Sequence, residues 1–254
     1  MIPGVRLVVL GKQGAGKGTQ CVRLSHHYVV PHVSTGDMLR SEVKSRTSLG
    51  QRAQKLMDQG DLIPDEMVME MVGSRLSERD TTGRGFVLDG CPRTTFQAER
   101  LDQMVQPTGL DLVVDLQVPT GLVLKRLASR RVCVDCGANY STAAPPLVNW
   151  TCDVCGGEVV QRQDDTEEAI KRRLDLYEVE TEPLLDWYKQ RELLVEVNGT
   201  GSPDAVTRRV VGAIDTLRRK TKAKDDKLEK DQNEKDQRDK GRPKGQGQGD
   251  KGAS

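Results

Sequence analysis

The stretch VRLVVLGKQGAGKGTQ, residues 5–20, joins an apolar run to a glycine-rich loop that ends in a lysine. The run predicts a buried strand, and the residues from Lys17 onward predict a helix. Gly11, Gly16 and Lys17 match the pattern G-x-x-x-x-G-K. In such a loop, glycines let backbone N–H groups surround phosphate oxygens, while the helix N-terminus and the lysine add positive charge. We therefore predict a phosphate-binding loop, with a simple strand-to-helix turn as the alternative.

The residue after the lysine departs from the commonest form of this loop. Gly18 and Thr19 follow Lys17, so the hydroxyl stands one position later than the usual Ser or Thr. Direct magnesium ligation by that hydroxyl is therefore a weaker expectation.

Outward from this loop, short apolar runs alternate with helical patterns. Strands are expected at 5–10, 85–89, 110–118 and 193–197, with a weaker one at 28–34. Helices are expected at 17–27, 36–44, 65–79, 96–105, 120–130, 166–190 and 203–219. Strands that are apolar throughout and are each followed by a helix indicate a parallel sheet covered on both faces. Ligands of such α/β folds bind at the carboxyl ends of the strands, where the loop falls.

The bulk composition limits the classes of partner. The chain has 254 residues, of which 30% are charged, with a net charge of only +1. This balance argues against a uniformly basic nucleic-acid surface. We expect no membrane association, because no apolar run approaches the ~18 residues of a span. The start of the chain lacks a secretion-signal pattern, so we expect a cytoplasmic protein.

The last 35 residues differ in composition from the rest. Almost every residue from Lys220 to Ser254 is charged, polar or glycine, and Leu228 is the one large aliphatic side chain. Such a segment cannot bury enough apolar surface to offset its ordering entropy. We predict a disordered, charged tail at 220–254, with a helical extension to about residue 239 and contact with polyanions as alternatives.

Four of the six cysteines form two C-x-x-C pairs separated by fifteen residues. These are Cys133, Cys136, Cys152 and Cys155. Four thiolates at this spacing suit tetrahedral Zn²⁺, with iron as the alternative metal. No ligand position is left open for water, so a structural role is expected. The segment 132–161 is poor in large apolar residues, and a metal would supply the missing folding energy, about 10 kcal/mol or more in small zinc modules.

Further motifs resemble those of the adenylate kinase family in order and spacing. The loop G-x-x-G-x-G-K-G-T-Q is that family's form, in which Gly18 is normal. STGDMLR at 34–40, DGCPRT at 89–94, KRLASRR at 125–131 and RQDDTEEAIKRRL at 162–174 also agree. The resemblance covers roughly residues 5–219. Gln13 stands where the family usually has proline, and Cys91 where it usually has an aromatic residue.

The resemblance implies a P-loop NTPase-type α/β core with a five-stranded parallel sheet and helices on both faces. Within a domain at 1–219, it implies a nucleoside-monophosphate-binding (NMP-binding) segment at 34–63 and a lid at 130–165 that closes over ATP. It also implies a monomeric kinase that converts ATP and AMP reversibly to two ADP molecules, with magnesium, and a structural zinc in the lid. We expect nucleotide substrates and no nucleic-acid partner.

Phosphoryl transfer of this kind needs electrostatics rather than a general base, because the attacking phosphate oxygen is already ionised. Arginines suit the task, since their planar forks match phosphate oxygens. By resemblance the catalytic residues are Lys17, Asp89, Arg93, Arg130, Arg162 and Arg173. The expected ATP contacts are Gly14, Ala15, Gly16, Lys17, Gly18, Thr19, Arg126, Arg130, Asn139, Tyr140 and Gly201. The expected AMP contacts are Thr35, Gly36, Arg40, Asp61, Leu62, Ile63, Gly90, Cys91, Pro92, Arg93, Gln97, Arg162 and Arg173.

Several roles have alternatives. Asp89 ends an apolar strand, where an acid holds Mg²⁺ through water, although it could instead cap the next turn. Asp164 and Asp165 resemble an acidic pair that closes against ATP, or they belong to a solvated loop. Tyr140 could pack within the cysteine knuckles, and Gly201 could serve only a turn.

Three other functions compete with an AMP kinase. The first is a kinase for UMP, CMP or GMP, because reading of adenine by Gln97 rests on the resemblance alone. The others are a nucleotide-dependent switch, disfavoured by the lack of an N-K-x-D motif, and a zinc-ribbon nucleic-acid binder, disfavoured because the knuckles lack a basic and aromatic surface.

Overall fold

The computed structural model describes residues 4–162 and 164–219, so the predicted charged tail lies outside the described residues. The chain divides into two compact units, Met1–Ala213 and Ile214–Ser254. Residues 203–213 of the first unit are helical, and so are residues 214–219 of the second. All labelled elements below belong to the first unit.

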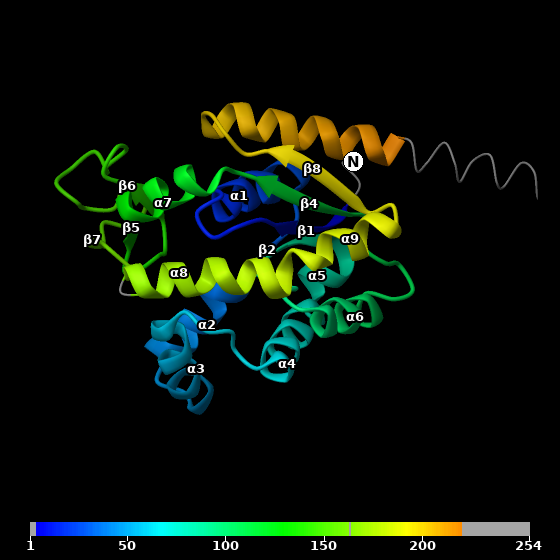
Figure 1. Cartoon of the computed structure of the whole chain (residues 1–254), viewed down its shortest axis with the longest axis horizontal. Helices are drawn as coiled ribbons and strands as arrows, with labels where there is room; N and C mark the ends of the chain where they lie inside the picture. Colours follow the sequence, from blue (N-terminus) through cyan, green and yellow to red (C-terminus); the bar gives the residue numbers. More distant parts are fainter. Residues whose placement is uncertain (1–3, 163, 220–254) are drawn as a thin grey trace, which may run out of the picture. The chain divides into compact units, whose positions relative to one another are not determined.

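Five parallel strands form the central sheet (Figure 1) in the order β2-β3-β1-β4-β8. These strands are β1 Val5–Leu10, β2 His32–Ser34, β3 Gly85–Asp89, β4 Leu112–Gln117 and β8 Leu194–Asn198. The sheet confirms the predicted α/β fold. Its register pairs Val9 with Asp89 and Leu10 with Asp115, so the carboxyl ends of three strands meet beside the loop after β1.

Helices precede or follow the strands of this sheet. They are α1 Lys17–Tyr28, α2 Thr35–Lys44, α3 Ser48–Gln59, α4 Asp65–Leu76, α5 Arg79–Arg84, α6 Thr95–Met104, α7 Thr120–Ser129, α8 Glu167–Leu176 and α9 Pro183–Gln190. Side-chain caps fix several of their starts. The hydroxyls of Ser34, Thr94 and Thr166 accept hydrogen bonds from the backbone N–H groups of Asp37, Gln97 and Ala169, respectively.

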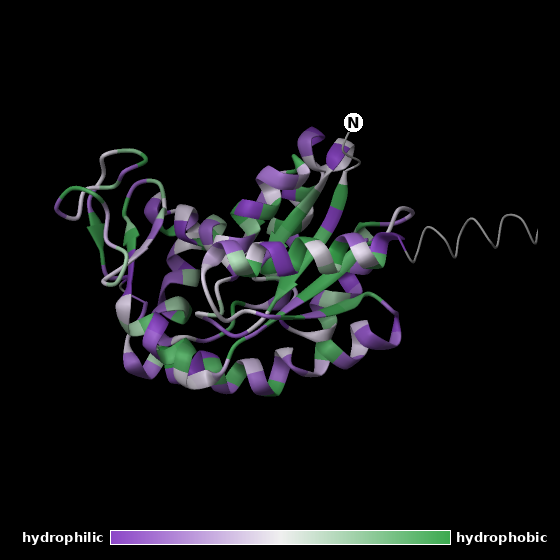
Figure 2. Ribbon diagram, turned by 90° about the horizontal axis from the view of Figure 1, so that it is seen from above, coloured by the Kyte–Doolittle hydropathy of each residue, from purple (hydrophilic) through white to green (hydrophobic). Residues whose placement is uncertain are grey.

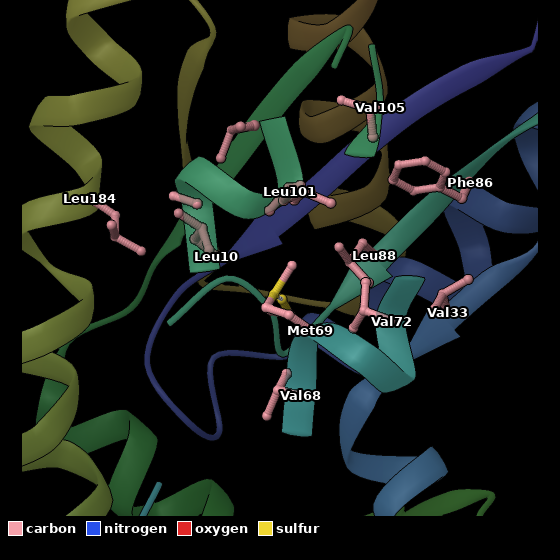
Figure 3. Packing of buried hydrophobic residues seen from close by; sticks show 14 of the residues in the cluster. Leu10, Val33, Val68, Met69, Val72, Phe86, Leu88, Leu101, Val105 and Leu184 are labelled. Atoms are coloured by element: carbon pink, nitrogen blue, oxygen red, sulfur yellow. Dashed lines mark hydrogen bonds between the residues drawn. The ribbon is translucent and has the colours of Figure 1, made fainter. Parts of the chain in front are cut away.

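The core of the unit lies on both faces of the sheet because successive strand residues point to opposite sides. Val8 and Leu88 join a buried cluster with residues of α4, α6 and α9 (Figure 3), including Met69, Leu101 and Leu184. Helix α1 packs against β1, β2 and β3. Figure 2 shows this arrangement in the hydropathy of the residues. The strands of the central sheet are largely hydrophobic, whereas hydrophobic and hydrophilic residues alternate along the helices. The buried side chains on both faces therefore fix the position of the loops at the carboxyl edge of the sheet.

The predicted single helix 166–190 is interrupted in the structure. Helix α8 ends at Leu176, a π-helical turn covers Tyr177–Thr181, and α9 begins at Pro183. The backbone N–H of Glu182 donates to the carbonyl oxygen of Tyr177 at 2.8 Å, five residues earlier. Pro183 has no N–H to donate, and its ring would clash with the carbonyl four residues before it, which explains the wider turn.

Helices α3 and α5 were not expected from the sequence. Helix α3 fully buries only Gly50 and Ala53, although Leu49, Leu56 and Met57 follow a helical spacing and pack against the core cluster while partly exposed. Its start is nevertheless capped by the Thr47 hydroxyl, which accepts from the Gly50 N–H at 3.0 Å. Gly50 also has no room for a side chain, because a Cβ there would lie 2.1 Å from the Glu42 carbonyl oxygen of α2.

A second, smaller sheet follows α7. It is antiparallel, in the order β6-β5-β7, and is formed by β5 Arg130–Cys133, β6 Asn139–Ser141 and β7 Val159–Val160. We call residues 130–165 the lid, as in the sequence prediction. Cys133 ends β5, Cys136 lies in the loop that follows it, and Cys152 and Cys155 lie between β6 and β7.

Candidate active site and metal centre

The loop between β1 and α1 has the geometry that its glycines predict. Gly11, Gly14 and Gly16 have φ values of 134°, 79° and 103°, which side-chain-bearing residues rarely adopt. A Cβ on Gly14 would also lie 2.9 Å from Cγ of Leu127. Helix α1 begins directly after the loop, at Lys17, so its free N–H groups face the same space.

Lys17 lies inside this loop. Its Nζ donates to the backbone carbonyl oxygens of Gly11 and Lys12 at 2.7 and 3.1 Å. Burial lowers the pKa of Lys17, while the nearby Asp89 carboxylate acts in the opposite direction. An incoming phosphate would act in the same direction as Asp89 and favour the charged form of Lys17.

Asp89 ends β3 beside this loop, as the sequence predicts. A Cβ on Gly18 would lie 3.6 Å from Oδ2 of Asp89, so the position after the lysine faces this carboxylate closely. The carboxylate of Asp89 by itself suits a magnesium ion held through water, because oxygen is the ligand atom that Mg²⁺ prefers.

Guanidinium groups from the lid and from α8 converge on the acidic pair Asp164 and Asp165. Arg130 Nε donates to Oδ2 of Asp165 at 2.7 Å, and Arg162 and Arg173 both bond Oδ2 of Asp164 at 2.8 Å. These two pairings lower the pKa of Asp164 in spite of the opposing effect of its burial. The acidic pair thus belongs to an ionic network with the arginines rather than to a solvated loop.

Arg93 and Arg126 are held by backbone carbonyl groups. Arg93 Nε donates to the Gly90 oxygen at 2.9 Å, and Arg126 donates to the oxygens of Ala15 and Gly199 at 2.9 and 3.1 Å. Burial lowers the pKa of Arg93, and the neighbouring Arg173 lowers it further. Like charges brought together in this way create a strong site for anions.

The acceptor side is built around α2 and the turn after β3. The Thr35 hydroxyl donates to the Asp89 carbonyl oxygen at 3.2 Å, and the guanidinium group of Arg40 pairs with Asp37. Gly90 has a φ of 85°, and a Cβ there would meet the Thr35 hydroxyl at 2.5 Å. The Thr35 hydroxyl therefore leaves no room for a side chain at position 90.

Gln97 is held by a residue that the sequence analysis missed. Its Nε2 donates to Oδ1 of Asp65 at 2.7 Å, and its Oε1 accepts from the Arg93 N–H at 2.8 Å. Asp65 also accepts from the Thr94 hydroxyl at 2.6 Å. Asp65 is the first residue of α4 and directly follows Pro64, and an acidic residue is common at a helix start. The sequence therefore gave no sign of its contact with Gln97, which only the fold reveals.

One cavity of about 1300 Å³ collects most of the predicted nucleotide contacts. All of them line it except Cys91. Single-ligand pockets usually measure ~300–1000 Å³, so this cavity has room for two nucleotides. Cys91 lies instead in the core, with its Sγ 3.8 Å from Sδ of Met69, which explains how a small side chain fits this position.

The four lid cysteines meet as predicted. Their Sγ atoms all lie within 4.8 Å of one another, with Cys133 to Cys155 and Cys136 to Cys152 at 3.5 Å. Tetrahedral zinc holds two sulfur ligands about 3.8 Å apart, so these spacings fit a metal ion. Backbone N–H groups of Asp135 and Val154 point at Sγ of the first cysteine of each knuckle, both at 3.4 Å.

The Tyr140 side chain contributes to this knuckle. Its hydroxyl lies 3.5 Å from Cys152 Sγ and accepts from the Asp153 N–H at 2.9 Å. This hydroxyl is the main cause that lowers the pKa of Cys152 to about 6, and it thus favours the thiolate that a metal requires. Tyr140 also lines the large cavity together with Asn139, so a contact with ATP stays a prediction.

Gly201 lies in the turn before the helix at 203–213, with a φ of 102°. The guanidinium group of Arg209 binds the carbonyl oxygens of Asn198 and Thr200 beside it. The turn thus explains the glycine, and its predicted contact with ATP is untested. Among the described residues, no helix combines the length and apolar character of a membrane span.

Comparison with known proteins gives consistent matches. The family model described as adenylate kinase matches residues 9–193. An adenylate kinase of Caldicellulosiruptor bescii is 46% identical over 213 residues, which cover 83% of this chain and 99% of the relative. Those of Thermodesulfovibrio yellowstonii and Streptomyces avermitilis are 48% and 43% identical over 205 and 224 residues. These alignments cover 80% and 87% of this chain, and 95% and 100% of the relatives.

Proposed function

The chain belongs to the adenylate kinase family, and we propose that the residues around its large cavity carry out that family's phosphoryl transfer in the roles given below. The enzyme is a nucleoside monophosphate kinase that interconverts ATP and AMP with two ADP molecules. The observation that supports these roles best is the cavity itself, which is lined by the glycine-rich loop, by α2 and by the lid.

On the ATP side, the loop N–H groups and Lys17 would hold the phosphates, because they are the positive groups at the start of α1. Arg126 already binds the loop carbonyl of Ala15, so its charge lies next to the same phosphates. Magnesium would supply a positive charge shared between phosphate oxygens, and Asp89 would hold it through water.

On the acceptor side, Arg40 and Arg93 would bind the phosphate of AMP. Arg130, Arg162 and Arg173 would neutralise the charge that develops during transfer. In the structure these three arginines are paired with Asp164 and Asp165, which hold the guanidinium forks in position with N–H groups to spare. No side chain has to remove a proton, since the attacking phosphate oxygen is ionised.

The proposal also covers the acceptor nucleotide, the lid metal, the oligomeric state and the cellular compartment. We propose AMP as the preferred acceptor, zinc as the lid metal, and a monomer acting in the cytoplasm. The lid contributes a structural metal site at one end and Arg130 and Arg162 at the other, so its closure would bring charge onto the phosphates and exclude water.

The test is an assay of ADP formation from ATP with AMP, GMP, CMP or UMP, for the native enzyme and for Lys17→Met. We expect clear preference for AMP and a loss of about 10³-fold or more in kcat for the variant, with an unchanged melting temperature. Lys12→Met is the matched control, because the Lys12 side chain in the same loop points away to Glu178 at 3.0 Å. Near-normal turnover of Lys17→Met would contradict the proposed roles.

A further inference from the structure

Three potential metal ligands from three elements meet beside the phosphate loop. They are Cys21 on α1, His32 on β2 and Asp89 at the end of β3. One ligand atom from each lies within 4.8 Å of the other two. Parallel pairing of β2 with β3 brings the histidine and the aspartate together, and the contact of α1 with both strands adds the cysteine.

The imidazole of this cluster lacks a hydrogen-bond partner on one nitrogen. His32 Nε2 is buried and makes no hydrogen bond within the described residues. Oδ2 of Asp89 lies 3.8 Å from this nitrogen, which is too far for a hydrogen bond. Buried polar atoms are rarely left unpaired, and an unpaired one calls for an explanation such as an ion.

We propose that Cys21, His32 and Asp89 form a second metal site, which takes a borderline divalent cation such as Zn²⁺ and thereby inhibits phosphoryl transfer. Thiolate, imidazole and carboxylate together select such a cation over Mg²⁺, which prefers oxygen ligands alone. The inhibitory part of the proposal rests on the roles of Asp89 and Lys17 given under the proposed function.

The spacing permits this coordination with small movements. Tetrahedral zinc holds sulfur, nitrogen and oxygen ligands about 3.3–3.6 Å apart, so contraction of the cluster by about 1 Å suffices. On binding, the metal–sulfur bond replaces the thiol proton of Cys21, which leaves to solvent. Three protein ligands leave the fourth position open for water or a phosphate oxygen. The ion can enter from the nucleotide cavity, which Asp89 lines.

A metal ion in this site would disturb Asp89 and Lys17, the two charged residues that we propose act on ATP and its magnesium. Asp89 would be bound to the inhibitory ion and could no longer hold magnesium through water. Lys17 lies near both Asp89 and Cys21, since both acids affect its pKa. A divalent cation at this point would repel its ammonium group from the loop. The site thus differs from the lid centre, whose four thiolates lie at a separate place and stabilise the fold.

The experiment measures bound metal and activity separately on the full chain with its lid metal in place. Zn²⁺ is set at fixed free concentrations with a metal buffer, and bound metal per chain is determined. We expect two ions per native chain, and one for Cys21→Ala and for His32→Gln. His27→Gln, which removes an imidazole of α1 outside the cluster, is the matched control and should still bind two.

ADP formation is then followed at the same free Zn²⁺ concentrations with excess Mg²⁺ and ATP. The native enzyme and His27→Gln should be inhibited, whereas Cys21→Ala and His32→Gln should need about tenfold more free Zn²⁺ or higher, with each rate taken relative to the same protein without zinc. Equal inhibition of all four proteins would overturn the proposal, as would a single bound ion in the native chain. Because metal binding is read without turnover, failure of the proposed kinase roles would be recognised separately.

Discussion

The central sheet and the lid are stabilised by different means, although they belong to one compact unit. In the sheet, residues such as Val8, Leu88 and Val113 are fully buried. In the lid, the buried cluster consists of Cys133, Cys152 and Val159, with Ala138 and Tyr140 packed against it. Other apolar side chains of the lid are exposed, namely Val134, Leu147, Val148, Trp150 and Val154, and Leu147 retains 90% of its accessible surface.

The difference shows which interaction each region depends on. Burial of one large aliphatic side chain contributes about 1.5–3 kcal/mol, so the sheet has many independent contributions. The lid has few such contributions, and we expect a metal held by its four cysteines to supply the stabilisation that burial does not. A region of this kind can open and close over a ligand, because few packed side chains have to separate when it moves.

The largest expected effect comes from removal of the lid metal, for which we choose Cys136→Ser. The lid should lose local folding free energy on the order of 10 kcal/mol, because metal binding supplies its folding. Hydrogen exchange at the amides of Cys133 and Cys152, which bond Ala138 and Gly157, should become fast. The amides of β1 should stay protected.

Cys91→Ser serves as the control, since it alters a cysteine that lies in the core outside the lid. Its lid amides should exchange as in the native protein. If the lid of Cys136→Ser kept native protection without metal, the comparison drawn above would fail.

The complementary change is Leu88→Ala, in the middle of β3. Its side chain is fully buried in the cluster shared with α4 and α6, so the free energy of unfolding of the core should fall by about 3 kcal/mol, as measured by urea denaturation. Metal content should stay unchanged. Leu147→Ala in the lid should change the same free energy by less than about 0.5 kcal/mol, and equal effects of the two would contradict the comparison.

The smallest effect concerns the ionic network that joins the lid to α8. Asp164 has a lowered pKa because Arg162 and Arg173 favour its carboxylate more than burial disfavours it. Its contribution is therefore present above the unfolded-state pKa of about 3.9 and is lost as pH falls through the lower folded-state value. Asp164→Asn should lower stability by about 2 kcal/mol at pH 7.

This difference should shrink as the pH falls from about 5 towards 2, as followed by unfolding of both proteins across that range. Glu168→Gln, at an exposed position two residues beyond the cap of α8, is the control and should differ little from native at any pH. A difference that stays constant down to pH 2 would show that the network does not depend on the charge of Asp164.

The sequence by itself determined the features that depend on spacing along the chain. The glycine pattern around Lys17, the two cysteine pairs and the alternation of apolar runs with helical patterns were sufficient to predict the turn before α1, the meeting of the four lid cysteines and the parallel sheet. Each rests on residues within one local segment or on a pattern that only one kind of structure satisfies. The π-helical turn before Pro183 was missed because the apolar pattern continues through it.

Only the tertiary structure decided which distant side chains meet. The pairing of Arg130 with Asp165, the hold of Asp65 on Gln97, and the placement of Cys21 beside His32 and Asp89 all join residues from different elements. Parallel register aligns the carboxyl ends of strands that are far apart in the chain, and a shift of one residue would turn these side chains to the opposite face. Contacts of this kind follow from the packing of the sheet, which no local pattern encodes.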